Sequence, residues 1–467
     1  MGIQTEIGGH RVERDEMGEV QVPVLALYGA QTQRAVENFP ISGLRLGPEF
    51  IRALGLIKRA AAVNNARMGV LDPAVANAIL SAAEEVVEGR HDGQFVVDVF
   101  QTGSGTSTNM NANEVIARLA SAHCGHDVHP NDHVNRSQSS NDVIPSAIHV
   151  AAVEMIHGLL LPAMDGLHQA LRDKALEFAD VIKIGRTHLQ DALPVRLGDE
   201  FGAYARQVEL SIERVKVAGD ALLELPMGGT AVGTGVNAPA EFGRFMAEVI
   251  SVWTRQPFRE AVNHFQAQSS RDAVMAMAGA LKAFAVALMK IGNDLRLLAS
   301  GPRCGFGELN LPAVQPGSSI MPGKVNPVII ESTLMVCAQV MGYESAITWC
   351  CAGGQLELNA MLPLMAYDLL EAIRILANTS RNLADRCISG ITANRELIAD
   401  EAERSFALVT ALTPDIGHEA AAAIAREAHT RGTTVRDAAR AMSGLSEERL
   451  NELLDAKRLA DGSLPSR

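Results

Sequence analysis

Gly317-Ser-Ser-Ile-Met-Pro-Gly-Lys-Val-Asn-Pro327 is the stretch around which this chain is organised. Its glycines and prolines exclude a continuous helix or a central strand, and segments with helical apolar periodicity lie on both sides. We therefore expect a loop held between rigid helices. The loop combines a cation, an amide and hydroxyl groups with backbone N–H groups, and this combination suits an anion. The polar side chains are Ser318, Ser319, Lys324 and Asn326, with Glu331 on the next helix.

Two simpler interpretations of this loop exist. A phosphate-binding P-loop has four residues between its glycines and a Ser or Thr after its lysine. Here five residues separate Gly317 from Gly323, and Val325 follows Lys324, so we set the P-loop aside. An ordinary connection between helices remains open, because the composition of the loop alone does not exclude it.

The composition favours packed helices and an anionic protein. Of the 467 residues, 47% are apolar but only 4% are aromatic, so small aliphatic side chains fill the core. Lys and Arg number 41 against 54 Asp and Glu, which gives a net charge of −13. We therefore expect neither nucleic acid nor a membrane surface as a partner. An anionic substrate needs a local concentration of donors.

The cysteines and the N-terminus predict a cytoplasmic protein. The six cysteines show no framework spacing and no CxxC motif, so we expect reduced thiols. Residues 1–22 lack the apolar run of an export signal. No charge-free run approaches membrane-spanning length.

Apolar periodicity predicts a mainly α-helical chain with an N-terminal domain over 1–140, a central long-helix bundle over 141–395 and a small helical domain over 396–467. Residues 1–48 look irregular, because glycine and proline recur in them. A long helix after residue 142 has a candidate kink at Pro162. The other helices are expected over 48–63, 72–88, 113–122, 197–225, 241–253, 267–300, 325–350, 355–386, 401–412, 416–431 and 434–442.

Three further segments contain compact polar side chains. Residues 101–114, Gln-Thr-Gly-Ser-Gly-Thr-Ser-Thr-Asn-Met-Asn-Ala-Asn-Glu, place hydroxyl and N–H groups at a helix start, where they bind carboxylates without a charge. Ser137-Gln-Ser-Ser-Asn-Asp142 also precedes a helix and is equally consistent with a capping box. Gly185-Arg-Thr-His-Leu-Gln-Asp-Ala-Leu-Pro194 contains a histidine, which by itself is more often structural than catalytic.

Residues 123–133 are rich in side chains that can ligate zinc. Their spacing matches no common zinc pattern, and Gly125 and Pro130 interrupt the segment, so we expect no metal. The side chains concerned are His123, Cys124, His126, His129, Asp132 and His133.

Together these segments resemble the fumarase/aspartase superfamily, in particular its class II fumarases. The resemblance covers essentially the whole chain and includes Tyr28–Ile41 and His129-Pro-Asn-Asp-His-Val-Asn135. It implies a long-helix bundle with a mixed N-terminal domain, no cofactor, and a homotetramer whose active sites combine segments from three subunits. Residues 226–235 resemble the glycine-rich crossover of the family, which supports the site.

The resemblance also implies residue roles. Ser318 is the base, acting as an alkoxide that loop N–H groups and Lys324 stabilise. His188, with Glu331 as its partner, handles the leaving hydroxyl group. The implied substrate ligands are Ser104, Thr106, Ser139, Ser140, Asn141, Thr187, Ser319, Lys324 and Asn326. The implied secondary anion site comprises His129, Asn131 and Asp132.

The implied reaction is reversible, cofactor-free hydration of fumarate to (S)-malate through an aci-carboxylate intermediate, a step of the tricarboxylic acid cycle. Neutral donors outnumber cations among these residues, as suits a small dicarboxylate whose reaction moves charge onto a carboxylate.

Two alternatives stay open. Some segments lean towards aspartate ammonia-lyase, which forms fumarate from aspartate: Gly185–Asp191 with Val195-Arg-Leu-Gly198, Val328 and Gln355-Leu-Glu-Leu-Asn359. Ser107 and Tyr343-Glu-Ser345 also depart from the fumarase pattern. A non-enzymatic, crystallin-like protein would be marked by loss of Ser318, Lys324 or His188, and all three are present.

Overall fold

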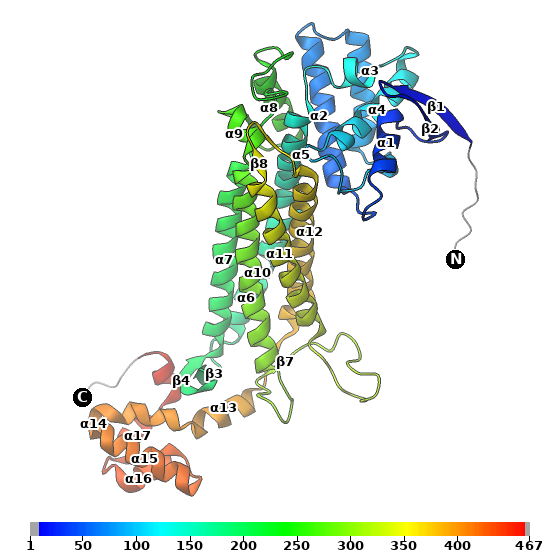
Figure 1. The fold of residues 1–467 in the computed structure, drawn as a ribbon. Helices are drawn as coiled ribbons and strands as arrows, with labels where there is room; N and C mark the ends of the chain where they lie inside the picture. Colours follow the sequence, from blue (N-terminus) through cyan, green and yellow to red (C-terminus); the bar gives the residue numbers. More distant parts are fainter. Residues whose placement is uncertain (1–8, 463–467) are drawn as a thin grey trace. The chain divides into compact units, whose positions relative to one another are not determined.

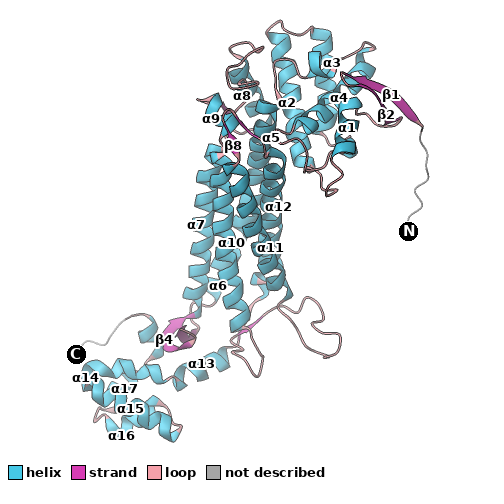
Figure 2. Cartoon of the chain, in the orientation of Figure 1, coloured by secondary structure: helices cyan, strands magenta, loops and turns pink. Residues whose placement is uncertain are grey.

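The computed structural model describes residues 9–462, and helices dominate them (Figure 2). The mainly α-helical fold class is thereby confirmed. The chain forms two compact units. The first comprises Met1–Pro162, Ser211–Ala285 and Val336–Ala377, and the second comprises Ala163–Leu210, Val286–Met335 and Asn378–Arg467. The division into 1–140, 141–395 and 396–467 stays a prediction.

A β-hairpin and a short helix occupy part of the segment that we expected to be irregular. β1 (His10–Asp15) pairs antiparallel with β2 (Gly18–Pro23), and α1 (Ala30–Asn38) follows. Exposed and partly buried residues alternate along both strands. The expectation was wrong here because the alternating run is short and mostly polar. Residues 1–8 of that segment lie outside the described residues.

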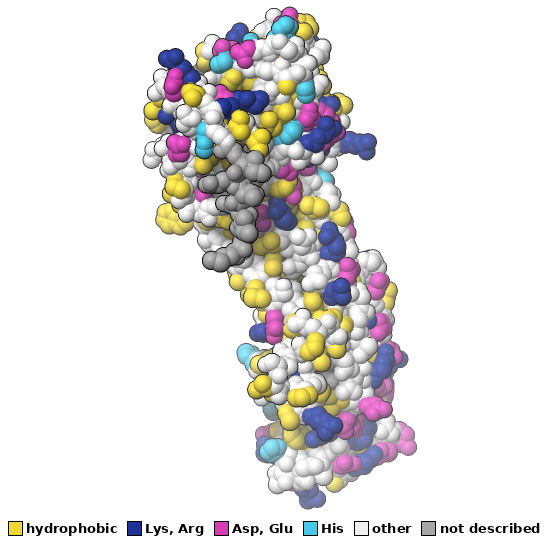
Figure 3. Space-filling model, turned by 90° about the vertical axis from the view of Figure 1, so that its right-hand side faces the viewer, with side chains coloured by type: hydrophobic (Ala, Val, Ile, Leu, Met, Phe, Trp, Pro, Cys, Tyr) yellow, Lys and Arg dark blue, Asp and Glu magenta, His cyan; other side chains and the backbone are white. Residues whose placement is uncertain are grey.

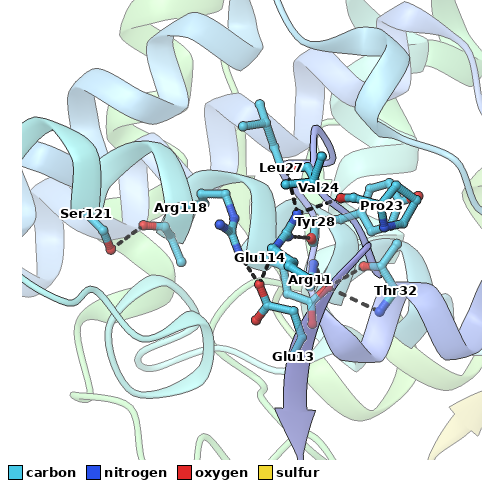
Figure 4. Close-up of polar contacts among 12 residues, drawn as sticks. Arg11, Glu13, Pro23, Val24, Leu27, Tyr28, Thr32, Glu114, Arg118 and Ser121 are labelled. Carbon is cyan, nitrogen blue, oxygen red and sulfur yellow. Dashed lines mark hydrogen bonds and ion pairs between the residues drawn. The ribbon is translucent and has the colours of Figure 1, made fainter. Parts of the chain in front are cut away.

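Glu114 on α4 (Thr106–Cys124) holds this N-terminal segment (Figure 4). Its carboxylate accepts the backbone N–H groups of Gly29, Gln31 and Thr32 at 2.8, 2.9 and 3.1 Å, and the Thr32 hydroxyl at 2.5 Å. These donors lie at the start of α1, which has no side-chain cap at Gly29. Arg11 on β1 donates to the carbonyl groups of Pro23 and Tyr28, both at 2.7 Å. A buried carboxylate thus supplies the missing cap.

Three helices of the first unit pack side by side: α2 (Pro48–Arg67), α3 (Pro73–Val87) and α4 (Figure 1). The helices expected over 48–63 and 72–88 are confirmed. A proline in the first turn starts both, and the Asp72 side chain caps α3 by accepting the N–H of Ala74 at 2.8 Å. α4 starts at Thr106 rather than 113, because the left-handed turn at Gly105 (φ 71°) already leads into the helix.

The remaining long helices follow the predicted periodicity. α5 (Ser140–Met155) continues through a π-helical stretch, Ile156–Leu160, into α6 (Leu161–Glu177). The irregular stretch lies next to Pro162, which has no N–H group for the helical ladder. The other helices are α7 (Leu197–Ala221), α8 (Phe242–Thr254), α9 (His264–Ser269), α10 (Asp272–Leu298), α11 (Val328–Ala352) and α12 (Leu362–Arg386).

Three further expected helices have different bounds. The helix expected over 267–300 is divided at Ser270, whose extended backbone ends α9, so α10 starts at Asp272. The helix expected over 355–386 starts at Leu362, because β8 (Gly354–Gln355) and β9 (Leu358–Asn359) form a small hairpin before it. The helix expected over 401–412 is divided at Ser405, whose extended backbone ends α13 (Arg395–Arg404) and whose side chain caps the 3₁₀-helix Phe406–Leu412.

Two continuous helical stretches are long and apolar enough to cross a membrane by length and composition, Ser140–Glu177 and Asp272–Leu298. In their most apolar windows, 78% and 50% of the residues are buried in the protein. Core helices of packed bundles share this composition. The absence of a membrane partner stays a prediction.

The C-terminal part of the second unit has its own apolar core. Short helices surround it: α14 (Thr413–Ile416), α15 (His418–Arg431), α16 (Val435–Met442), α17 (Glu447–Leu453) and α18 (Ala456–Ala460). The core includes Leu412, Ile424, Val435 and Leu450. The same unit contains a hairpin that we did not predict, β3 (Ile182–Thr187) with β4 (Gln190–Arg196).

Candidate active site

The predicted site residues divide between the two units. The first unit contains Ser104, Thr106, His129, Asn131, Asp132, Ser139, Ser140 and Asn141. The second contains Thr187, His188, Ser318, Ser319, Lys324, Asn326 and Glu331.

In the first unit, the start of α4 brings hydroxyl groups together. The hydroxyl groups of Ser104 and Thr106 lie 2.8 Å apart, on either side of Gly105. A Cβ atom at Gly105 would lie 2.9 Å from the Ile144 side chain, in addition to the strain of its positive φ. Glycine is therefore required for this tight approach, which fixes both hydroxyl groups at the helix start.

The start of α5 forms the capping box that the sequence left open. Ser139 is the N-cap residue, and the Asp142 carboxylate accepts the Ser139 N–H at 2.9 Å. The other oxygen of Asp142 accepts the N–H groups of Gly228 and Thr230 at 3.1 and 3.0 Å. Burial raises the pKa of Asp142 to about 6, against the opposing effect of these N–H groups.

The glycine-rich run 226–235 therefore packs against the candidate site. Besides its bonds to Asp142, it accepts a hydrogen bond from the Asn141 side chain, whose Nδ2 lies 2.8 Å from the Ala231 carbonyl oxygen. This hydrogen bond fixes the NH₂ group of Asn141. Ser139, Ser140 and Asn141 all remain partly accessible. Sequence reasoning gave no role to Asp142, because a capping carboxylate has no distinctive spacing.

Some backbone N–H groups of the loop at His129 already donate hydrogen bonds within the loop. The His129 Nδ1 atom accepts the N–H groups of Asn131 and Asp132 at 3.3 and 3.1 Å. These two N–H groups are thus already bonded. His129 and Asp132 themselves are exposed, with Nδ1 3.3 Å from the Asp132 carboxylate. The secondary anion site stays a prediction that rests on the remaining donors.

In the second unit, His188 lies at the tip of the β3–β4 hairpin. Thr187 pairs with Gln190, so His188 and Leu189 form the two-residue turn between the strands. Both have positive φ angles, 55° and 61°, which favour Gly or Asn. Bulky residues in this conformation are strained, and such strain gathers at functional sites. The turn exposes the His188 side chain.

Buried charges hold the base of this hairpin. Lys183 lies 3.0 Å from Glu200 and 3.1 Å from Glu308, and Arg186 contacts Glu308 and Glu401. Lys183 and Glu308 are buried. The pairs fix β3, and thereby the position of the turn at its end.

The loop 317–327 closes on itself through backbone and side-chain contacts. The Gly317 N–H donates to the Lys324 carbonyl at 2.9 Å, and the Asn326 side chain donates to the Gly317 carbonyl at 2.6 Å. A Cβ atom at Gly317 would lie 2.5 Å from the Lys324 carbonyl oxygen, so only glycine fits. Within this closed loop, the Ser318 Oγ atom accepts the N–H groups of Ile320 and Met321 at 3.3 and 3.0 Å.

Lys324 and Asn326 line a cleft of about 850 Å³ in the second unit. Asn293 and Arg296 of α10 and Asn310 also line it. The sequence did not single out Asn293 and Arg296, because α10 was identified by its apolar face, and Asn310 lies in no motif. An apolar cavity of about 650 Å³ at Leu193, Val409 and Leu459 contains no predicted site residue.

His188 and Glu331 are not in contact in the described chain. Among residues 9–462, no hydrogen bond or ion pair joins them, and both side chains are exposed. No group of three or more His, Cys, Asp or Glu side chains is placed to hold a metal ion in these residues. The predicted pairing of His188 with Glu331 therefore stays a prediction.

Comparison with known proteins shows what the chain resembles. The family model described as Lyase matches residues 18–342, and the model described as Fumarase C C-terminus matches residues 408–461. A Corynebacterium glutamicum protein named fumarate hydratase class II is 51% identical over 456 residues, which are 96% of each chain. A Mycobacterium tuberculosis protein of the same name is 51% identical over 98% of each chain.

Solved structures of similar proteins indicate the same family. Class II fumarase from Schistosoma mansoni superposes with a TM-score of 0.94 at 37% identity, over 97% of this chain and 99% of the other. A fumarate lyase:delta crystallin from Brucella melitensis gives 0.93 at 44% identity, over 97% and 100%. The fold and the matched segments define a lyase of the fumarase/aspartase superfamily. Within it, the chain belongs to the class II fumarate hydratase family.

Proposed function

We propose that this enzyme hydrates fumarate reversibly to (S)-malate by anti addition of water through an aci-carboxylate intermediate. The names of the relatives support fumarate hydration and do not favour aspartate ammonia-lyase. The observation that carries the mechanism is the Ser318 oxygen, which accepts two loop N–H groups at 3.3 and 3.0 Å. Such donors stabilise negative charge on oxygen, so Ser318 is suited to act as an alkoxide base.

In the direction of dehydration, the Ser318 alkoxide takes the proton from C3 of malate. The electron pair of that C–H bond moves into the adjacent carboxylate and gives the aci-carboxylate. The C2–O bond then breaks on the opposite face, and the leaving hydroxide receives a proton from His188, directly or through water. Glu331 orients the His188 ring in this proposal. Hydration follows the same steps in reverse.

The aci-carboxylate carries one more negative charge than the ground-state carboxylate. Lys324 and Asn326 line the same cleft, and neither the Lys324 ammonium nor the Glu331 carboxylate has an ion pair within the described residues. An unpaired ammonium is suited to stabilise that extra charge. Ser319 and Thr187 add neutral donors, and Ser104, Thr106, Ser139, Ser140 and Asn141 bind the second carboxylate.

We further propose that the protein is a homotetramer with active sites shared between subunits. α11 is rich in apolar residues and leaves Met335 and Trp349 67% and 77% exposed. Hydrophobic side chains also lie among the charged ones on the face in Figure 3. Large apolar side chains exposed on a long helix mark an interaction surface, and in this proposal further copies of the chain cover them. We place the enzyme in the cytoplasm, in keeping with its expected reduced thiols.

One assay tests the proposed function. Fumarate absorbs near the ultraviolet edge, so its formation can be followed with malate and then with aspartate as the substrate. We expect rapid fumarate formation from malate and little from aspartate. Ammonia release from aspartate that is faster than fumarate formation from malate would overturn the proposal in favour of aspartase.

A further inference from the structure

Lys58 on α2 is a fully buried lysine with an unusual set of partners. Its Nζ atom lies 3.0 Å from the Asn135 Oδ1 atom and 2.9 Å from the Gln138 Oε1 atom. No carboxylate lies within 4.0 Å of it among the described residues. Burial lowers its pKa to about 7, and the charge of Asp142 acts in the opposite direction.

Other buried lysines of the chain are arranged differently. Lys183 pairs with the carboxylates of Glu200 and Glu308, and Lys174 pairs with Glu177 at 2.7 Å. Such pairs neutralise a buried charge. Lys58 instead faces two amide oxygens in the segment between the His129 loop and Ser139. A role in orienting amide groups explains this choice of partners better than charge neutralisation does.

A chain of hydrogen bonds leads from Lys58 to Ser140. The Asn135 Oδ1 atom, which accepts from Lys58, also accepts from the Asn109 Nδ2 atom at 3.1 Å. The same Nδ2 atom lies 3.3 Å from the Ser140 Oγ atom. Below its pKa, Lys58 is an ammonium, which only donates, and it then fixes which end of the Asn135 amide is the oxygen. Asn109 must then present its NH₂ group to both Asn135 and Ser140.

The donor-to-acceptor direction of these hydrogen bonds determines whether the Ser140 hydroxyl group can donate to a ligand. Its oxygen accepts from Asn109, so its own hydrogen is free to point away from Asn109. We propose that Lys58 is a positioning residue that fixes the Ser140 hydroxyl as a donor to a substrate carboxylate. This inference rests on the proposed function, in which Ser140 is a carboxylate ligand. Without Lys58, the side-chain amides of Asn135 and Asn109 can flip, so that oxygen and NH₂ exchange places. Ser140 can then donate its hydrogen to Asn109 instead.

A double-mutant cycle tests this relay. Lys58→Met should raise KM for malate about tenfold or more, the value of one hydrogen bond to a charged group, with a smaller effect on kcat. Ser140→Ala should raise KM by a similar factor. Because both changes remove the same interaction, Lys58→Met/Ser140→Ala should be no worse than Ser140→Ala alone. Multiplying effects would show that Lys58 does not act through Ser140, and would overturn the inference.

A matched pair of variants distinguishes the hydrogen-bond relay from a general structural role of Lys58. This test remains available if Lys58→Met does not fold. Asn135→Leu and Gln138→Met each remove one acceptor of Lys58, but only Asn135 continues the chain to Asn109. We expect Asn135→Leu to raise KM about tenfold and Gln138→Met less than about threefold. Equal effects would overturn the relay. A wild-type enzyme that does not turn over malate would instead overturn the proposed function, so the two failures are distinguishable.

Discussion

Buried polar groups behind the site segments of the first unit and exposed site residues of the second unit differ in the partners that they already have. In the first unit, Lys58, Asn109 and Asp142 are buried and bonded to their neighbours. In the second unit, His188, Lys324 and Glu331 are exposed, and within residues 9–462 their side chains have no hydrogen bond or ion pair.

This contrast teaches that the two groups of residues should respond differently to mutation. Buried groups that serve as partners for the fold contribute to stability as well as to binding. Exposed groups without partners are left free for the substrate and for other copies of the chain. Changes at these buried groups should therefore lower stability, whereas changes at these exposed groups should act mainly on the reaction.

The largest expected effect belongs to the exposed loop. Ser318→Ala removes the proposed base but keeps the carboxylate ligands, so kcat should fall by about three orders of magnitude or more with little change in KM. The melting temperature should stay unchanged. Ser443→Ala is the matched control, because Ser443, like Ser318, is partly buried and accepts a neighbouring N–H, from Leu445 at 3.2 Å. Near-normal turnover of Ser318→Ala would mean that the base lies elsewhere.

The next effect should appear in stability, at a buried group. Glu114→Gln places an amide where the carboxylate now accepts several donors, so at least one backbone N–H of Gly29, Gln31 or Thr32 loses its partner. We expect a loss of about 2–3 kcal/mol, seen as a lower melting temperature. Glu37→Gln on the exposed side of α1 is the control and should change little. A melting temperature equal to that of the wild type would contradict the anchoring role of Glu114.

A pH-dependent effect should distinguish another buried group. Asp368 is 4% exposed, one of its oxygens has no hydrogen-bond partner in the described chain, and burial raises its pKa to about 7. In the unfolded chain, the Asp368 carboxyl group loses its proton near pH ~4. The contribution of Asp368 to the free energy of unfolding therefore falls as the pH rises from about 4 to about 7. Asp368→Asn does not titrate, and its melting temperature should exceed that of the wild type more at pH 8 than at pH 5. A melting-temperature difference that is the same at both pH values would show that the pKa of Asp368 is not raised by burial.

The smallest effect should come from relief of strain in the exposed hairpin. Leu189→Gly removes a positive-φ leucine, so the free energy of unfolding should rise by about 0.5–1 kcal/mol, with a slightly higher melting temperature. The freer turn should hold His188 less well and lower kcat several-fold. Arg255→Gly is the control, because Arg255 (φ 57°) ends α8 with the same backbone strain. If kcat of Leu189→Gly is unchanged, the strained turn has no part in placing His188.

The sequence was most informative where one periodicity dominated. The bounds of α2 and α3 follow from apolar spacing with a proline in the first turn of each helix. The β3–β4 hairpin was not predicted, because its strands are short and its turn, His188-Leu189, has none of the usual turn residues. β1 and β2 were missed for a similar reason, since polar residues carry their alternation.

The candidate site shows the same limit. Resemblance to the superfamily identified the segments that contain Ser318, His188 and Ser140, because their residue types recur as compact motifs. It did not identify Lys58, since a lysine in a helical segment usually lies on the exposed face. Arg296 was missed likewise. Their positions depend on contacts between residues far apart in the chain, which no local pattern records.

The central claim is that the exposed groups complete their site with other copies of the chain, and one measurement tests it directly. Ser318→Ala and His188→Asn, each inactive alone, are co-expressed with different tags, and the mixed tetramers are purified and assayed for fumarate formation from malate. If each site takes Ser318 from one subunit and His188 from another, about a quarter of the sites in randomly mixed tetramers contain both wild-type residues. We therefore predict that activity returns to about a quarter of the wild-type value. Activity that stays at the background of the two parent variants would contradict the account, because it would place both residues of each site in one chain.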